Sequence, residues 1–295
     1  MKNSCHSSGV LRISAAVVLC LAIFCAPARA QVTPPDLFKS LQKRLIADGF
    51  DPQRIEQIYQ HDDVYFETQG VAAYFQHNEA TLDYDKFTSA GYIRDAQAYM
   101  QTHADALKRA EQKFGVDPRA ITAIILVETK FGRYLGKSSI LNTLSTMAAL
   151  SEARPREFLW ERLPAERRFT RLEYDRKADA KADWAYKELK AFLTYTSLHG
   201  IDPPSVVGSY AGALGIAQFM PSNILAFGQD GNGDGRINLF EDADAIFSIA
   251  SYLQNYGWKP GIGRGQAGKV IYHYNHSRYY VEAVLKIMDL LKGQA

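Results

Sequence analysis

A twelve-residue acidic loop is the feature that most restricts what this chain can form. The loop runs from Asp230 to Glu241 with the sequence DGNGDGRINLFE. Short oxygen-bearing side chains and a glycine stand where the EF-hand calcium loop needs them, at positions one, three, five, six and twelve. Alternating oxygens of this kind converge on a hard cation. The single loop therefore predicts one structural Ca²⁺ rather than a calcium sensor, and a merely turn-rich acidic loop accounts poorly for five matched positions.

The ligands follow from the motif, with one exception. The expected donors are the side chains of Asp230, Asn232 and Asp234 and the backbone carbonyl of Arg236. Spacing leaves the closing carboxylate open, because Glu241 stands at the usual twelfth position and Asp244 could close a slightly longer loop. No organic cofactor is indicated.

The N-terminus has the pattern of a secretory signal peptide. A basic start at Lys2 and Arg12 precedes an apolar run from Ile13 to Ala26, and Ala28-Arg29-Ala30 supplies a small-x-small cleavage site. The run is too short to serve comfortably as a permanent membrane span. We therefore expect cleavage after Ala30, secretion, and no transmembrane segment afterwards.

The positions of the cysteines and the net charge bear on disulfides, on a lipid anchor and on nucleic-acid binding. Cys5, Cys20 and Cys25 all lie in the predicted signal peptide, so the mature chain would have no disulfide. A lipid anchor is not supported, because Leu19 and Phe24, rather than small residues, precede Cys20 and Cys25. Removing the three basic residues of this segment takes the formal charge from +2 to −1, which gives no support for a nucleic-acid partner.

Helical patterns dominate the remainder, and few segments have the pattern of a strand. The expected fold class is mainly α. The expected organisation is a signal peptide over residues 1–30, an N-terminal helical lobe over 31–105 and a core over 106–295 with a charged helical segment at about 152–198. Among the expected helices are residues 120–130, 140–150, 184–198, 243–255 and 279–291.

Glu128 is the candidate catalytic residue. It continues the i, i+3, i+4, i+7 stripe that Ile121, Ile124 and Ile125 begin, so a carboxylate occupies the apolar face of a helix. Burial penalises the charged form, and the expected direction of its pKa shift is upward, which keeps a proton available for donation near neutral pH. The alternative is a structural Glu paired with Lys130 or Arg133.

Two further segments carry polar and aromatic groups that suit a sugar-binding groove. Residues 208–221 combine small residues with Ser209 and Gln218, although such a segment also suits close helix packing. Residues 272–280 place tyrosines beside amide and hydroxyl groups, a mixture that stacks on sugar faces and bonds their hydroxyls.

Taken in order, residues 127–133, residues 208–221, the calcium loop and residues 274–277 make the chain similar to the membrane-bound lytic murein transglycosylase B family. The resemblance covers about residues 114–291. It implies a lysozyme-like core of the goose type, peptidoglycan glycan strands as substrate and a periplasmic location in a Gram-negative envelope.

The resemblance also implies roles for individual residues. Glu128 matches the catalytic glutamate, and Asp244 rather than Glu241 matches the closing calcium ligand. The positions implied to line the groove, hold the sugars or orient the glutamate are Ser209, Gln218, Tyr252, Tyr274, Asn275 and Tyr280.

The chain departs from this family at two places. Relatives usually carry a long β-rich insertion where this sequence has only residues 259–273, so a groove wall built there is not expected. Arg154-Pro155-Arg156 stands where relatives have a Pro-Arg-Arg run, which leaves contacts to peptide stems open.

A single well-placed carboxylate favours one mechanism. Ordinary glycosidases use two carboxylates. Glu128 alone suffices if the 6-hydroxyl of N-acetylmuramic acid attacks its own anomeric carbon, giving a 1,6-anhydro sugar. The alternatives are a muramidase, which would need a second acid such as Asp202 or Glu173, and a non-catalytic glycan-binding protein of the envelope.

Overall fold

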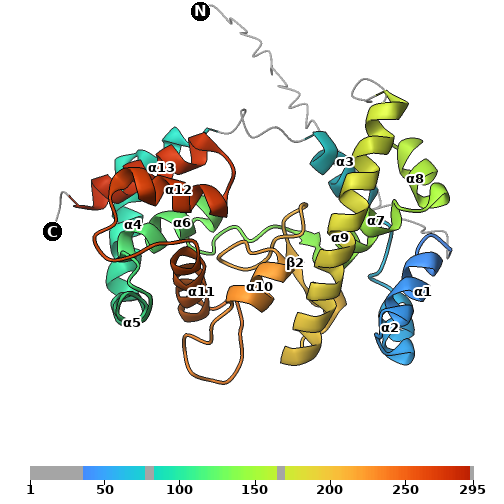
Figure 1. Cartoon of the computed structure of the whole chain (residues 1–295), viewed down its shortest axis with the longest axis horizontal. Helices are drawn as coiled ribbons and strands as arrows, with labels where there is room; N and C mark the ends of the chain where they lie inside the picture. Colours follow the sequence, from blue (N-terminus) through green and yellow to red (C-terminus); the bar gives the residue numbers. More distant parts are fainter. Residues whose placement is uncertain (1–35, 77–82, 165–169, 293–295) are drawn as a thin grey trace, which may run out of the picture. The chain divides into compact units, whose positions relative to one another are not determined.

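The computed structural model describes residues 36–76, 83–164 and 170–292 (Figure 1). The predicted signal peptide, residues 1–30, lies outside the described residues. Within these ranges no helix has both the length and the apolar character that a membrane crossing requires. Thirteen α-helices and one two-stranded sheet make the described chain mainly helical, as expected.

The first five helices cover the region expected to form the N-terminal lobe and the start of the core. They are α1 (Lys39–Ala47), α2 (Pro52–Tyr59), α3 (Thr68–Gln76), α4 (Ala90–Thr102) and α5 (Ala104–Phe114), with a 3₁₀ turn, η2 (Asp85–Thr88), before α4. α1 and α3 pack against α7, whereas α4 and α5 pack against α6. Buried apolar side chains from Leu37 to Leu291 form one cluster, and the boundary at residue 105 stays a prediction.

The remaining helices lie within the region that was expected to form the core. They are α6 (Pro118–Thr129), α7 (Ile140–Ala149), α8 (Ala153–Trp160), α9 (Arg171–His199), α10 (Pro221–Phe227), α11 (Asp242–Asn255), α12 (Arg264–Tyr274) and α13 (Arg278–Lys292), and a second 3₁₀ turn, η4 (Pro203–Ser205), follows α9. α12 occupies the short segment where relatives are expected to carry an insertion, and the sequence patterns had not indicated this helix.

α6 is a central helix. Asp117 caps it by accepting the backbone N–H of Arg119, and Pro118 fills its first turn, where a missing N–H costs nothing. Residues 120–126 are buried all round, because α4, α5, α11 and α13 enclose the helix (Figure 1). The apolar stripe that predicted a one-faced helix therefore belongs to a helix surrounded by protein.

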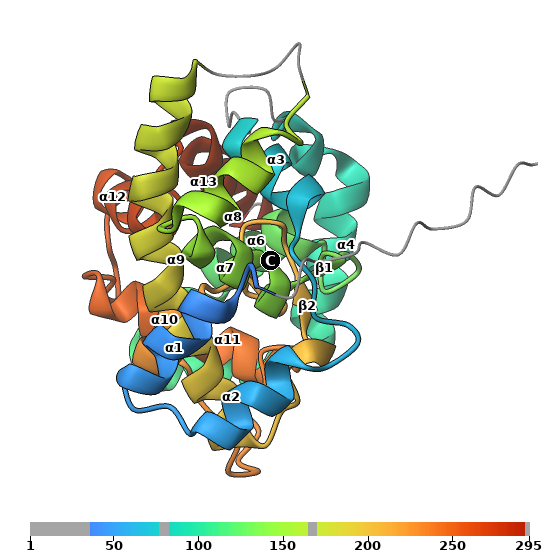
Figure 2. The same ribbon diagram turned by 90° about the vertical axis from the view of Figure 1, so that its right-hand side faces the viewer.

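α9 is longer than its apolar pattern indicated. A reciprocal capping box between Thr170 and Glu173 begins the helix, and Gly200 ends it in the left-handed conformation, 29 residues later. Its charged first half buries Tyr174, Ala178 and Ala182 at helical spacing. Exposed side chains on the same half pair along the surface, for example Arg171 with Asp175. The helix lies along α7 and α10 (Figure 2).

A very small sheet joins the segment after α6 to the segment after α9. β1 (Ser138–Ser139) pairs antiparallel with β2 (Val207–Gly208), and single bridges continue from Gly208 to Leu214 and from Leu214 to Phe219. Gly136 has a φ of +90°, and a Cβ there would lie 2.0 Å from the carbonyl oxygen of Gly208. Only glycine permits this approach, which brings residues 208–219 beside the end of α6.

Candidate active site

Glu128 lies in the last turn of α6 and is half-buried. The hydroxyl of Tyr280, from α13, donates a hydrogen bond of 2.7 Å to its Oε1. Arg133, one of the two partners considered for a structural glutamate, instead forms an ion pair with Asp95 at 2.7 Å. A phenol held in the core therefore fixes one oxygen of the carboxylate.

The tyrosines around Glu128 stay protonated. Burial and the nearby Glu128 carboxylate raise the pKa values of Tyr274 and Tyr280 well above the usual 10, and burial raises that of Tyr252. Tyr274 donates to the carbonyl of Ala217 at 2.5 Å, so its hydroxyl proton is used within the protein. Tyr280 can consequently donate to Glu128 across the whole working pH range.

The tyrosine rings support one another. The rings of Tyr274 and Tyr280 are nearly parallel, at 7° and 6.4 Å, and the Tyr252 ring lies 5.1 Å from that of Tyr274. Phe219 lies 5.6 Å from Tyr252 and 5.8 Å from Tyr274. Tyr252 and Tyr280 are 4% and 1% exposed, so these two rings hold the site rather than present faces to a ligand.

Strained backbone surrounds the glutamate. Among the residues that the structure describes, the non-glycine residues with positive φ are Lys130 (+51°), Phe131 (+62°) and Gln218 (+46°). Lys130 and Phe131 directly follow α6, and the Phe131 ring stacks on Tyr99 at 4.7 Å. Such conformations persist only where the surroundings enforce them, and they cluster at functional sites.

Thr129 is a site residue that the sequence patterns did not single out. Its buried Oγ1 donates to the carbonyl of Ile216 at 3.1 Å and accepts the N–H of Gly132 at 3.0 Å. It thereby ties the residue after Glu128 to the turn that carries Gln218. The only sequence signal was a hydroxyl beside the glutamate at the end of a helix.

Gln218 and Ser209, the predicted groove residues, lie in this same turn region and are both half-buried. Gln218 Nε2 donates to the carbonyl of Gly215 at 2.9 Å. Ser209 Oγ accepts the N–H of Ala213 at 3.0 Å, which leaves its own hydroxyl proton outside that bond. The side chains therefore shape the loop and keep part of their hydrogen-bonding capacity.

Residues 272–280, the second segment predicted to bind sugars, form the corner between α12 and α13. Tyr274 ends α12, half-buried Asn275 follows in extended conformation, and Tyr280 lies in the first turns of α13. Tyr252 donates to the carbonyl of His273 at 2.6 Å and so fixes this corner to α11. Residues from α6, α11, α12 and α13 thus converge around Glu128.

The acidic loop folds as a compact turn before α11. Asp230 accepts the N–H groups of Gly233 at 2.6 Å and Gly235 at 2.8 Å, and hydrogen bonding from Gly235 is the main cause that lowers its pKa. Asn232 and Asp234 accept the backbone N–H two residues further on, at 2.9 and 2.8 Å. The side-chain oxygens that were expected to bind calcium therefore belong to a single turn.

The two candidates for closing the loop are placed differently. Asp244 is fully buried and accepts the N–H groups of Gly231 at 2.8 Å and Asn238 at 2.7 Å. Its pKa is raised, first by burial and also by the charge of Asp230. Glu241 instead accepts side-chain N–H bonds from Asn232 and Asn238, both at 2.7 Å.

The loop's chemistry fits a hard cation. Its donors are oxygens throughout, and a bound cation would relieve the repulsion between Asp230 and Asp244. In the described ranges, however, no three Asp, Glu, His or Cys side chains converge in an arrangement that could hold a metal ion.

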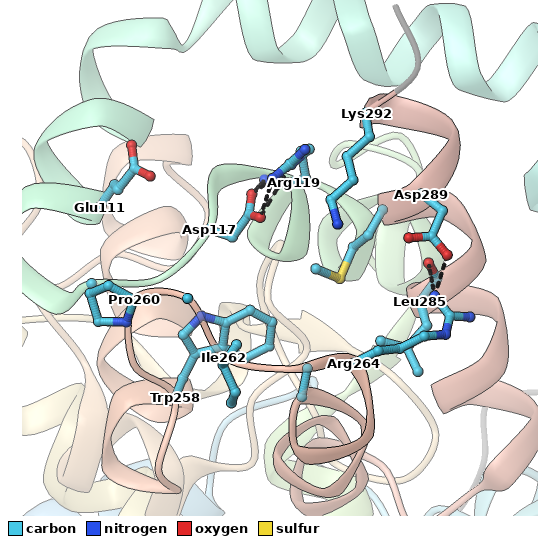
Figure 3. A pocket seen from close by; sticks show the side chains of 14 residues that line it. Glu111, Asp117, Arg119, Trp258, Pro260, Ile262, Arg264, Leu285, Asp289 and Lys292 are labelled. Carbon is cyan, nitrogen blue, oxygen red and sulfur yellow. Dashed lines mark hydrogen bonds and ion pairs between the residues drawn. The ribbon is translucent and has the colours of Figure 1, made fainter.

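A cavity of about 410 Å³ lies at the other end of α6 (Figure 3). Asp117 and Arg119 form an ion pair on its wall at 2.6 Å, and Arg264 pairs with Asp289 across from them. Glu128 does not line it. The cavity is therefore separate from the candidate active site.

Glu173 and Asp202, the residues considered as the second acid of a hydrolase, make contacts away from Glu128. Glu173 belongs to the capping box that begins α9, and hydrogen bonding from Thr170 lowers its pKa. Asp202 follows the far end of α9 and lies 4.0 Å from Arg54. None of these contacts involves Glu128.

Fold and site together define a class: mainly helical proteins of lysozyme-like architecture with a carboxylate at the end of a central helix. The chain belongs to the transglycosylase SLT domain family, whose model matches residues 35–269. It is 32% identical over 249 residues to membrane-bound lytic murein transglycosylase B of Escherichia coli (strain K12), covering 79% of this chain and 62% of that protein.

Solved structures show the same fold. The Escherichia coli lytic transglycosylase SLT35 in complex with calcium has a TM-score of 0.70 at 24% identity, covering 89% of this chain and 96% of that chain. The soluble lytic transglycosylase SltB1 from Pseudomonas aeruginosa has a TM-score of 0.70 at 25% identity, covering 88% and 99%.

Proposed function

We propose that this protein is a lytic transglycosylase that cleaves peptidoglycan glycan strands between N-acetylmuramic acid and N-acetylglucosamine. The observation that carries the proposal is the Glu128 carboxylate at the end of the central helix, held at 2.7 Å by a buried tyrosine hydroxyl. Family membership and similarity to lytic murein transglycosylase B support it.

In the proposed mechanism, Glu128 acts first as an acid and then as a base. Its carboxyl proton passes to the glycosidic oxygen, the bond to the anomeric carbon breaks, and N-acetylglucosamine leaves as the alcohol. The carboxylate then accepts the proton of the muramic acid 6-hydroxyl as that oxygen bonds to the anomeric carbon. No water is consumed, and Glu128 ends protonated as it began.

Neighbouring residues position the reacting groups. Tyr280 orients the carboxylate, and Thr129 fixes the end of α6 against the turn that bears Gln218. We assign sugar contacts to the polar groups of Ser209, Gln218 and Asn275, with Tyr252 and Tyr274 supporting this wall. Incubation of purified protein with insoluble peptidoglycan sacculi tests the proposal: glycan fragments should pass into solution, and their complete retention would reject it.

Tyr280→Phe removes the hydroxyl that holds Glu128 and keeps the buried ring. We expect kcat to fall about tenfold to a hundredfold, since a hydrogen bond to a charged group contributes about 1.5–3 kcal/mol. Steady-state release of fragments from sacculi measures this. Tyr279→Phe is the matched control, because Tyr279 is 58% exposed on the same helix, and equal losses in both variants would contradict the assignment.

We also propose that the acidic loop binds one Ca²⁺ through Asp230, Asn232, Asp234, the Arg236 carbonyl and Asp244. The oxygen-only donor set supports this, as does the calcium complex of SLT35. The ion would crosslink the loop to the first turn of α11.

Calcium should therefore raise the melting temperature. At a concentration about a hundredfold above Kd, binding adds about 2.7 kcal/mol, or roughly 5–10 °C for a chain of this size. Differential scanning calorimetry in EGTA and in Ca²⁺ measures the shift, which Asp230→Ala should abolish. The same melting curve with and without Ca²⁺ would contradict the proposed site.

We propose a periplasmic location after removal of residues 1–30. The signal-peptide pattern supports secretion, and the peptidoglycan substrate lies in that compartment.

A further inference from the structure

Three half-buried aromatic rings from α3, α9 and the segment after β2 form a second aromatic cluster. Tyr74 from α3 stacks on Trp184 from α9 at 6.2 Å and 18°, and Tyr210 lies 6.3 Å from Tyr74. All three retain part of their surface in solvent. We call Tyr74, Trp184 and Tyr210 the aromatic platform.

Lys181 fixes the platform. Its Nζ donates to the Tyr74 hydroxyl at 2.6 Å and lies 4.7 and 5.0 Å from the ring centroids of Tyr74 and Trp184. The hydrogen bond and the cation–π contacts hold the two rings in their stacked orientation. The platform is therefore preorganised, and binding to it loses little side-chain entropy.

The small sheet connects the platform to the candidate active site. Tyr210 lies two residues after Gly208, which bridges to Leu214, and Leu214 bridges to Phe219. Bridged strands lie about 4.8 Å apart, so the backbone at Gly208 lies roughly 10 Å from the backbone at Phe219. The Phe219 ring packs 5.8 Å from Tyr274, whose ring stacks on Tyr280. A ligand that extends several sugar rings can reach both places.

We propose that the aromatic platform is a remote glycan subsite that stacks on N-acetylhexosamine rings of the strand being cleaved. The part of these aromatic rings that reaches solvent can pack on the apolar faces of sugar rings, and Ser209, the residue before Tyr210, offers a polar neighbour. The inference rests on the proposed function in taking a β-1,4-linked glycan as the ligand. The platform would contribute binding to long strands without touching the reacting atoms.

The test is the affinity for N-acetylchitohexaose, measured by calorimetry in a Glu128→Gln background so that the probe is not consumed. Trp184→Ala should weaken binding about threefold to tenfold, as expected for loss of one aromatic stacking contact. The control is Trp160→Ala, which removes another half-buried indole, one that packs on Tyr174 instead. That control should retain the affinity of its parent.

Tyr210→Ala and the steady-state kinetics of cleavage provide a second variant and a second measurement. Tyr210→Ala should give a similar loss, and it replaces a loop residue if Trp184→Ala does not fold. With Glu128 restored, both variants should raise KM for long glycan strands and leave kcat nearly unchanged. Unchanged hexaose affinity, or a fall in kcat alone, would overturn the subsite. Absence of cleavage by the unmodified protein would reject the proposed function instead. The hexaose affinities of the variants would still test whether the aromatic platform binds glycan.

Discussion

Glu128→Gln should lower the rate of peptidoglycan cleavage by at least about a thousandfold, because a positioned acid/base contributes about 10²–10⁴ and here one group serves both steps. The amide oxygen can still accept the hydroxyl of Tyr280, so the melting temperature should stay within about 2 °C of the unmodified protein. Fragment release and calorimetry measure the two quantities.

The matched control is Glu282→Gln, which makes the same change on the exposed surface of α13, two residues after Tyr280. Its activity should equal that of the unmodified protein. A folded Glu128→Gln protein with substantial turnover would remove Glu128 from the acid/base role.

Gly136→Ala should cause the largest loss of stability among single-methyl substitutions at this site. The new Cβ would meet the Gly208 carbonyl at 2.0 Å, and the φ of +90° is unfavourable for alanine. Together the clash and the strain should cost about 3 kcal/mol or more, which lowers the melting temperature by roughly 6–12 °C. Activity should fall as well, since β2 and Ser209 must shift.

Gly49→Ala separates the two contributions. Gly49 has a φ of +96°, but a Cβ there would have no neighbour within 4 Å, so only the backbone strain remains. Its melting temperature should fall by about 2–8 °C, less than that of Gly136→Ala, because the left-handed conformation alone costs alanine about 1–2 kcal/mol. If both variants melt at the same temperature, the close approach of Gly136 to Gly208 does not support the site.

Local signals in the sequence predicted the mainly helical fold well. The helices expected at residues 120–130, 140–150, 243–255 and 279–291 correspond to α6, α7, α11 and α13. The same signals did not predict α12. α12 has no strong apolar stripe, whereas the charged first half of α9 lies in the segment that was expected to be helical and begins at a capping box.

In the candidate site, the local sequence pattern predicted the glutamate but not the contact that holds it. Glu128 was predicted because a carboxylate on an apolar helix face is locally anomalous. Its bond to Tyr280 joins residues 152 positions apart, which no local pattern reveals. The left-handed conformations of Lys130 and Phe131 are likewise invisible in sequence, because neither residue is glycine.

Mass spectrometry of the fragments released from peptidoglycan tests the central claim most directly. Attack by the muramic acid 6-hydroxyl predicts products that are one water lighter than reducing muropeptides, present with the unmodified protein and absent with Glu128→Gln. Fragments with hydrated reducing ends would contradict the account, because they would require a water nucleophile and a second carboxylate in reach of Glu128.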